Sequence, residues 1–78
     1  MAELSYGQKA VGLKFNPSEG DAHDKVAHVK QTCADLIDLV EDGRTANDSR
    51  LLNSLRTAAT MALVTAQMAV VKVITWTE

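Results

Sequence analysis

The chain has 78 residues, a net charge of −2 and 46% hydrophobic residues. The hydrophobic fraction excludes a disordered polar chain, and the near-neutral charge excludes a general binder of DNA or RNA polymers, which would carry a basic excess. The single cysteine, Cys33, excludes an internal disulfide framework and fits a reducing compartment such as the cytoplasm. A chain this short buries little apolar surface by itself, so we expect it to assemble with further copies.

Residues 1–20 are expected to form an N-terminal arm. This segment holds three of the four glycines and the only proline, Pro17, which lies in a turn-forming stretch over 16–21. Residues 12–15 are compatible with an extended backbone but are too few to predict a strand. Because no long apolar run follows a basic start, we expect no secretion signal.

The second expected element is a helix over about residues 21–42. Asp21 is the expected N-cap, and Gly43 stands where a helix C-terminus favours a left-handed residue. Apolar residues recur at alternating steps of three and four, which predicts one buried seam along the helix. The predicted seam consists of Val26, Val29, Cys33, Leu36 and Val40, with Ile37 beside it.

The third expected element is a long helix over about residues 48–75, capped by Asn47 or Asp48. It is apolar nearly all round, so other helices must cover it on every side. Its longest charge-free stretch, residues 57–71, is shorter than the roughly 20 apolar residues of a membrane span, so we expect no membrane partner. The sequence therefore predicts an all-α antiparallel helical hairpin over residues 21–78 that assembles into an oligomer.

Residues with catalytic chemistry are scarce. His23 and His28 are five positions apart and do not share a helix face, so they do not predict a metal site. Cys33 lies on the expected apolar seam, where a packed thiol is more typical than a nucleophile. With no glycine-rich phosphate loop in the sequence, we expect no enzyme, no metal and no cofactor.

The arm is better supplied for binding. It concentrates the aromatic residues Tyr6 and Phe15 with the cations Lys9 and Lys14. An aromatic ring stacks on a nucleobase while a nearby amine meets a phosphate. The alternative, which composition alone favours, is that Phe15 only plugs the end of the hairpin core.

Three further polar residues are candidates on the two helices. Lys30 and Thr32 are two positions apart, about 200° around a helix, so they face different sides and would serve different pockets. Arg56 lies near the start of an apolar stretch, where an arginine needs water or an anion. The alternatives are that Lys30 and Thr32 are ordinary surface or interface residues, and that Arg56 forms an ion pair with a carboxylate on the neighbouring helix: Asp35, Asp38 or Asp42.

Three parts of the chain resemble a known family. Residues 6–18 read YGQKAVGLKFNPS and residues 34–39 read ADLIDL. Both segments resemble the phage anti-CBASS cyclic-oligonucleotide sponge family, whose hairpin is shared with anti-Thoeris sponges. The long helix resembles the same family at Arg56, Ala59, Leu63, Ala66, Met68, Lys72, Ile74 and Thr75. These proteins hold cyclic oligonucleotide immune signals without cleaving them, in the cytoplasm of the infected bacterial host.

The resemblance implies a hexamer, a trimer of dimers, with two classes of pocket. For cyclic dinucleotides, at dimer interfaces, it implies Phe15, which replaces the family's tyrosine, and Lys30. The neighbouring arm residues Tyr6, Lys14 and Asn16 are expected to contribute to the same site. For cyclic trinucleotides, near the threefold axes, the resemblance implies Thr32 and Arg56.

The sequence leaves three alternatives to a sponge open, which makes four interpretations in all. The second interpretation is a purely structural oligomerisation hairpin without a nucleotide ligand. A membrane-associated peptide is a third interpretation, based on the apolar second helix. A hydrolase for the same nucleotides is a fourth, and it lacks candidate catalytic residues.

Overall fold

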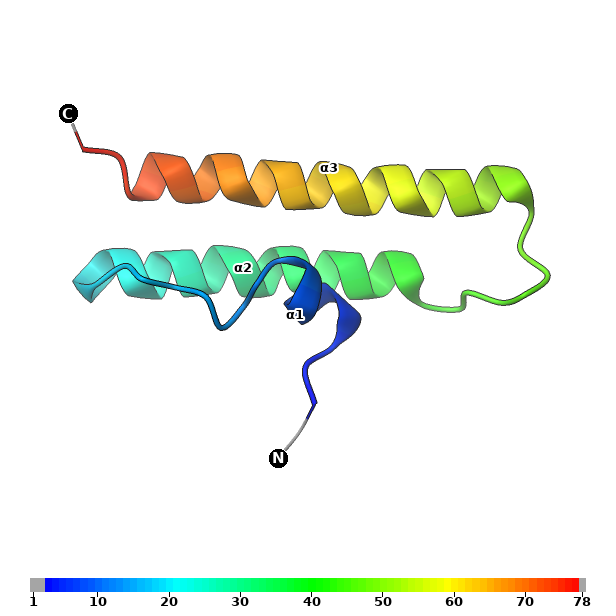
Figure 1. Cartoon of the computed structure of the whole chain (residues 1–78), viewed down its shortest axis with the longest axis horizontal. Coiled ribbons are helices and arrows are strands. Elements are labelled where there is room, and N and C mark those ends of the chain that lie inside the picture. Colours follow the sequence, from blue (N-terminus) through cyan, green and yellow to red (C-terminus); the bar gives the residue numbers. More distant parts are fainter. Residues whose placement is uncertain (1–2, 78) are drawn as a thin grey trace.

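The computed structural model describes residues 3–77, which contain three helices: α1 (Tyr6–Ala10), α2 (Gly20–Glu41) and α3 (Arg50–Ile74). Helices α2 and α3 run antiparallel to each other, and α1 lies against α2 (Figure 1). The predicted all-helical class is therefore confirmed for the described part of the chain. Residues 1–2 and 78, at the outer ends of the expected arm and hairpin, lie outside the described residues.

The arm contains a short helix that we did not expect. Ser5 Oγ accepts a hydrogen bond from Gln8 N at 3.1 Å, and Ser5 N donates to Gln8 Oε1 at 2.9 Å, which is a capping box. The spacing of Ser5 and Gln8 was the sequence signal for α1. An extended backbone over residues 12–15 is wrong, because Gly12 adopts a φ of 64° and Phe15 N donates to Gly12 O at 2.9 Å, closing a turn.

Helix α2 begins slightly before the expected position. Its N-cap is Glu19, without a side-chain hydrogen bond, so the expected cap at Asp21 is wrong and Asp21 lies in the first turn. At the other end, Gly43 has a φ of 76°, which confirms the left-handed residue expected after this helix.

Helix α3 is capped by Ser49, whose Oγ accepts from Leu52 N at 3.1 Å. The expected caps, Asn47 and Asp48, are therefore wrong. Asp48 instead closes the connecting loop, where its carboxylate accepts from Thr45 N at 3.2 Å and from Thr45 Oγ1 at 3.1 Å.

The buried side of α2 differs from the predicted seam. Leu36 is exposed, while Val29 and Cys33 are only partly buried. The reason is that α2 has two neighbours, α3 and the arm, so its buried arc is rotated toward the side that both of them cover. The residues that are buried on α2 are Val26, Lys30, Ala34 and Ile37.

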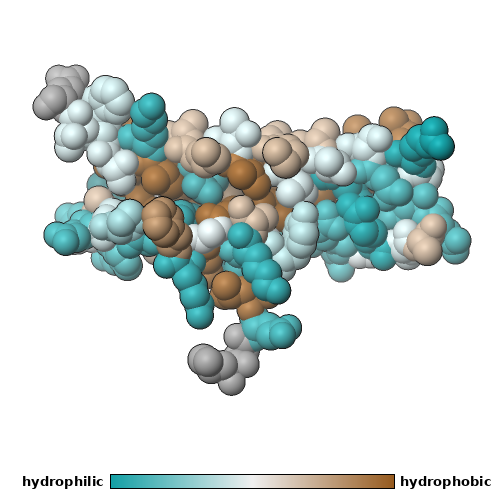
Figure 2. All heavy atoms as spheres, viewed as in Figure 1, coloured by the Kyte–Doolittle hydropathy of each residue, from teal (hydrophilic) through white to brown (hydrophobic). Residues whose placement is uncertain are grey.

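The core is small and sits where the arm crosses the two long helices. Val11 from the arm packs with Ala34 and Ile37 of α2. Figure 2 shows hydrophobic residues gathered in this region. The molecule extends 47 × 33 × 13 Å, so it is a single layer about one helix thick.

Helix α3 remains apolar toward solvent. Its inner side buries Thr60 and Gln67, whereas Leu51, Leu55 and Val73 are exposed. By length and composition alone, α3 is also apolar enough to cross a membrane, with 11% of its most apolar window buried in the protein.

Candidate functional site

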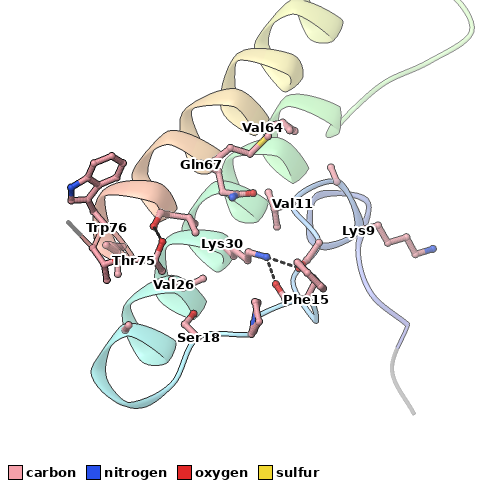
Figure 3. A pocket seen from close by; sticks show the side chains of 18 residues that line it. Lys9, Val11, Phe15, Ser18, Val26, Lys30, Val64, Gln67, Thr75 and Trp76 are labelled. Atoms are coloured by element: carbon pink, nitrogen blue, oxygen red, sulfur yellow. Dashed lines mark hydrogen bonds between the residues drawn. The ribbon is translucent and has the colours of Figure 1, made fainter.

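A pocket of about 850 Å³ opens between the arm, the first half of α2 and the second half of α3 (Figure 3). Its volume lies within the usual range for small-molecule sites, roughly 300–1,000 Å³. Most of its walls are apolar, and a few polar groups are placed among them. The polar lining residues are Lys9, Ser18, Lys30, Gln67, Thr75 and Thr77.

Lys30 is the central polar residue of this pocket, and its side chain fastens the arm. The residue is only 6% exposed, and its Nζ donates to Gly12 O at 2.9 Å and to Phe15 O. Burial lowers the pKa of Lys30 below its ordinary value of 10.5. An ammonium group has three N–H donors, so one donor remains for a ligand in the pocket.

Phe15 stands at the same turn with its ring in solvent. The residue is 73% exposed, and the ring centroid lies 5.6 Å from Lys30 Nζ. The expectation that Phe15 plugs the hairpin core is therefore wrong. The structure brings Phe15 and Lys30 together at the pocket, which places an open aromatic face beside a cation.

The three other arm candidates are not pocket residues. Asn16 shapes the loop, because its Nδ2 donates to His23 O at 2.9 Å and its Oδ1 accepts from Ser18 N at 3.3 Å. Tyr6 and Lys14 are exposed and lie outside the pocket lining. Asn16 therefore supports the loop that carries Phe15.

The arm is docked on α2 by contacts that sequence reasoning missed. Gly7 N, at the first turn of α1, donates to Asp38 Oδ1 at 2.6 Å. A Cβ at Gly7 would clash with the Ala34 carbonyl, so a glycine is needed for this close approach. Gln8 Nε2 adds a hydrogen bond to Gln31 Oε1 at 3.2 Å. These contacts hold the pocket wall against the hairpin.

Two further residues of the pocket were missed, and both are on the α3 side. Gln67 is buried, and with its amide nitrogen turned toward the arm it donates to Val11 O at 3.2 Å. Trp76 lies at the pocket edge, with Lys72 Nζ 6.0 Å from its ring. The only signal for Gln67 in the sequence is that it is a single glutamine in an apolar helix. The sequence does not reveal where its hydrogen-bond partner lies.

Thr32 lies apart from the pocket. It is exposed on α2, and its Oγ1 donates to His28 O at 2.8 Å, within the same helix. Lys30 is buried under the arm and Thr32 faces solvent, so the two residues do face different sides of α2, as their spacing predicts.

Arg56 is held at the turn of the hairpin. Its guanidinium donates to Val40 O and to Asp42 O, the latter at 3.3 Å, and its Nε lies 3.4 Å from Asp48 Oδ2. Its carboxylate partner is thus Asp48 in the loop, whereas Asp42 contributes only its carbonyl. Carbonyls at a helix C-terminus lack partners within the helix, so Arg56 caps the end of α2.

Possible metal ligands do not converge within residues 3–77. No group of three His, Cys, Asp or Glu side chains in this range is placed to hold a metal ion. Cys33 is partly buried, and burial raises the pKa of its thiol. His23 Nδ1 lies 3.7 Å from Asp24 Oδ1 in an exposed pair. The pocket beside Phe15 and Lys30 is therefore the best candidate site.

Comparison with known proteins finds no matching family model, curated protein or solved structure. The observations that bear on function are therefore the pocket and the sequence resemblance. Of the residues that the resemblance implies, Phe15 and Lys30 share the pocket, whereas Thr32 and Arg56 lie elsewhere.

Proposed function

We propose that the protein binds cyclic oligonucleotide signals, cyclic dinucleotides first, and sequesters them intact, which would block CBASS-type antiphage defence. The observation that carries this proposal is the exposed Phe15 ring 5.6 Å from the Lys30 ammonium at the mouth of the pocket. A ring that is open to solvent can stack on a nucleobase. The neighbouring ammonium supplies the positive charge that a phosphate requires.

The apolar pocket walls support the same proposal. A phosphate that is drawn toward Lys30 would be partly removed from water, where an ion pair is screened less than on an open surface. Because Lys30 also bonds the two carbonyls of the turn, ligand binding and arm geometry depend on one side chain. We therefore expect Lys30 to position Phe15 as well as to meet the ligand.

The symmetry of the ligand suits assembly into dimers. A cyclic dinucleotide has two bases and two phosphates in a ring with approximate twofold symmetry. A twofold pair of chains would offer Phe15 and Lys30 twice, so each direct contact is repeated without a second kind of site. A trimer of such dimers, implied by the resemblance, is part of this proposal.

A second site for cyclic trinucleotides is proposed at Thr32. Its exposed position on the opposite side of α2 from Lys30 leaves it free to contribute to a different pocket between chains. Arg56 would first have to leave the carbonyls of Val40 and Asp42. We expect Thr32→Val to weaken trinucleotide binding and to leave dinucleotide binding unchanged.

Calorimetric titration with a panel of cyclic di- and trinucleotides tests the proposal. Phe15→Ala should weaken dinucleotide binding by about 5- to 150-fold, since base stacking is worth about 1–3 kcal/mol. Lys30→Met should also weaken it, because it removes the positive charge that meets a phosphate. Leu39→Ala and Lys25→Met are the matched controls, because both positions are exposed on α2 outside the pocket. Circular dichroism of each variant shows whether the helices are retained.

Two results would contradict the proposal. Normal dinucleotide binding by both pocket variants would remove the site from this pocket. No binding of any member of the panel by the wild-type chain would favour the structural hairpin, which has no nucleotide ligand.

A further inference from the structure

The interior of the pocket, between α2 and α3, holds two polar side chains that are buried almost completely. Lys30 of α2 is 6% exposed and Gln67 of α3 is 4% exposed. Figure 3 shows both beside the arm. Lys30 Nζ donates to Gly12 O at 2.9 Å, and the amide nitrogen of Gln67, turned toward the arm, donates to Val11 O at 3.2 Å. Because the two acceptors belong to adjacent residues, the ammonium and the amide lie close together.

Within residues 3–77, each of these two groups keeps a hydrogen-bond donor without an acceptor. The ammonium of Lys30 has three N–H groups, and the carbonyls of Gly12 and Phe15 take two of them. A primary amide has two N–H groups, and Val11 O takes one of those on Gln67. A buried donor without an acceptor is costly, so each favours an occupant that brings one. Two neighbouring donors, one of them charged, suit the two oxygens of a carboxylate.

The other polar groups of the lining do not add donors inside the pocket. The hydroxyl of Ser18 donates to a side chain of the arm loop, and the hydroxyl of Thr75 donates to a carbonyl of α3. The remaining polar lining residues, Lys9 and Thr77, are exposed. A ligand inside the pocket therefore finds its donors in one place, at the ammonium and the amide.

The rest of the pocket interior is apolar. Val26 of α2 lines it together with Val71 and Ile74 of α3. From Gln67 to Ile74 this wall runs for seven residues, which is about 10 Å along a helix. The hydroxyls of a sugar would lose hydrogen bonds to water against such a wall, whereas an alkyl chain loses none. A nucleotide would therefore stay at the mouth of the pocket, and the interior suits an amphipathic molecule with one anionic end.

We propose that the interior of the pocket binds a fatty acid of medium chain length, whose carboxylate lies at Lys30 and Gln67. Its alkyl chain lies along the apolar wall between α2 and α3. The two carboxylate oxygens accept the two spare N–H groups, and the ammonium balances the negative charge where water screens it little. Each CH₂ group that the wall buries adds about fourfold to the affinity. This inference does not depend on the nucleotide ligand.

The exposed apolar residues of α3 are the competing place for an alkyl chain. Leu55 is 58% exposed and Val73 is 76% exposed, so a chain could also adsorb there. Those side chains offer no buried donor, and an adsorbed molecule would gain nothing from its carboxylate. Adsorption would also lack a fixed ratio of ligand to protein. Charge preference and stoichiometry therefore separate the pocket from the helix surface.

Trp76 gives a direct readout of the pocket, because it is the only tryptophan and lies at the pocket edge. Decanoate, kept below the concentration at which it forms micelles, should shift the emission of Trp76 to shorter wavelength. Calorimetry should give one decanoate per chain. 1-Decanol has the alkyl chain without the charge and should bind about 10- to 150-fold more weakly, because it loses a hydrogen bond between charged groups. Butyrate should bind about fourfold more weakly for each buried CH₂ group that it lacks.

Two neighbouring variants locate the site. Val71 is partly buried in the pocket wall, whereas Val70 is 43% exposed and lies outside the pocket lining. Val71→Asp places a negative charge beside the ligand and should weaken decanoate binding by more than about tenfold. Val70→Asp should bind as the wild type does. Circular dichroism checks that both variants are folded, and the wild-type comparison of decanoate with 1-decanol decides the matter if Val71→Asp is not.

Three results would overturn the proposal. They are equal affinities of the wild type for decanoate and 1-decanol, binding that does not saturate at a fixed ratio, and equal weakening by the two aspartate variants. These titrations contain no nucleotide, so their outcome and that of the nucleotide titrations are independent.

Discussion

Gly7 is the residue at which the arm comes closest to α2. A Cβ there would lie 2.8 Å from Asp38 Oδ1 and closer still to the Ala34 carbonyl. We expect Gly7→Ala to destabilise the fold by about 1–3 kcal/mol, because backbone atoms cannot move aside as a side chain can. Urea unfolding measures this loss. Lys9→Ala, exposed on the same short helix, is the control and should change stability by less than about 0.5 kcal/mol.

Arg56 is a second position where one side chain decides a local structure. Its side chain is 14% exposed and bonds carbonyls at the end of α2. Arg56→Ala leaves these carbonyls and Asp48 without their partner, so we expect a loss of about 2–3 kcal/mol. Arg50 is exposed at the start of α3, so Arg50→Ala should lower the free energy of unfolding much less. Equal losses in thermal or urea unfolding would contradict the capping role.

At the scale of elements, the α2–α3 connection depends on one carboxylate. The hydrogen bond from Thr45 N, the bond from its hydroxyl and the charge of Arg56 hold the pKa of Asp48 below its ordinary value of 3.8. A lowered pKa in the folded state stabilises the fold above the unfolded pKa, and this stabilisation is lost as the pH falls through the folded pKa. We therefore expect the wild-type chain to lose stability below about pH 4.

Asp48→Asn tests this pH dependence. The variant should be less stable than the wild type at neutral pH, and the difference between them should shrink at about pH 3. Urea midpoints at the two pH values give the comparison. Asp24→Asn, whose side chain is 88% exposed, is the matched control. If the difference in stability between Asp48→Asn and wild type is the same at both pH values, the carboxylate charge does not contribute to the pH dependence of stability.

The elements differ in how far the sequence determines them. Helix α2 follows from apolar periodicity and α3 from a long apolar stretch without glycine or proline, so their existence and approximate ends were predictable. Helix α1 was missed although Ser5 and Gln8 carry its capping signal. The buried side of α2 was misplaced because Lys30 is buried by carbonyls of the arm, a long-range contact that local periodicity does not encode.

The candidate site also combines residues that the sequence indicates with residues that it does not. Phe15 and Lys30 were named from the sequence resemblance, and their proximity could be seen only once the turn at Gly12 was known. Gln67, in the second half of α3, and Trp76, just past its last residue, reach the pocket from more than thirty positions along the chain from Lys30. Their positions in the pocket depend on how α3 packs against α2, a long-range contact that the sequence does not reveal.

At the scale of the whole molecule, the thin single layer makes stability depend on concentration. If copies of the chain associate through the exposed apolar residues of α3, such as Leu51, Leu55 and Val73, association stabilises the folded chain, and the melting temperature should rise with protein concentration. Ala62 is exposed at the middle of α3, so Ala62→Glu would place a charge in such an interface, and its melting temperature should not change with concentration. Ala46→Glu, at an exposed position of the connecting loop, should behave as the wild type. A wild-type melting temperature that is constant over a hundredfold dilution would contradict the paired assembly.

The central claim is that the chain holds a cyclic nucleotide without converting it. The most direct measurement mixes the protein with a cyclic dinucleotide, filters off the free ligand, then denatures the protein and identifies the released ligand by mass spectrometry. For a protein that sequesters its ligand, free ligand should be depleted and intact ligand should be recovered in a fixed ratio to the chain. Hydrolysed ligand would make the protein an enzyme, and undepleted ligand across the panel of cyclic di- and trinucleotides would contradict nucleotide binding.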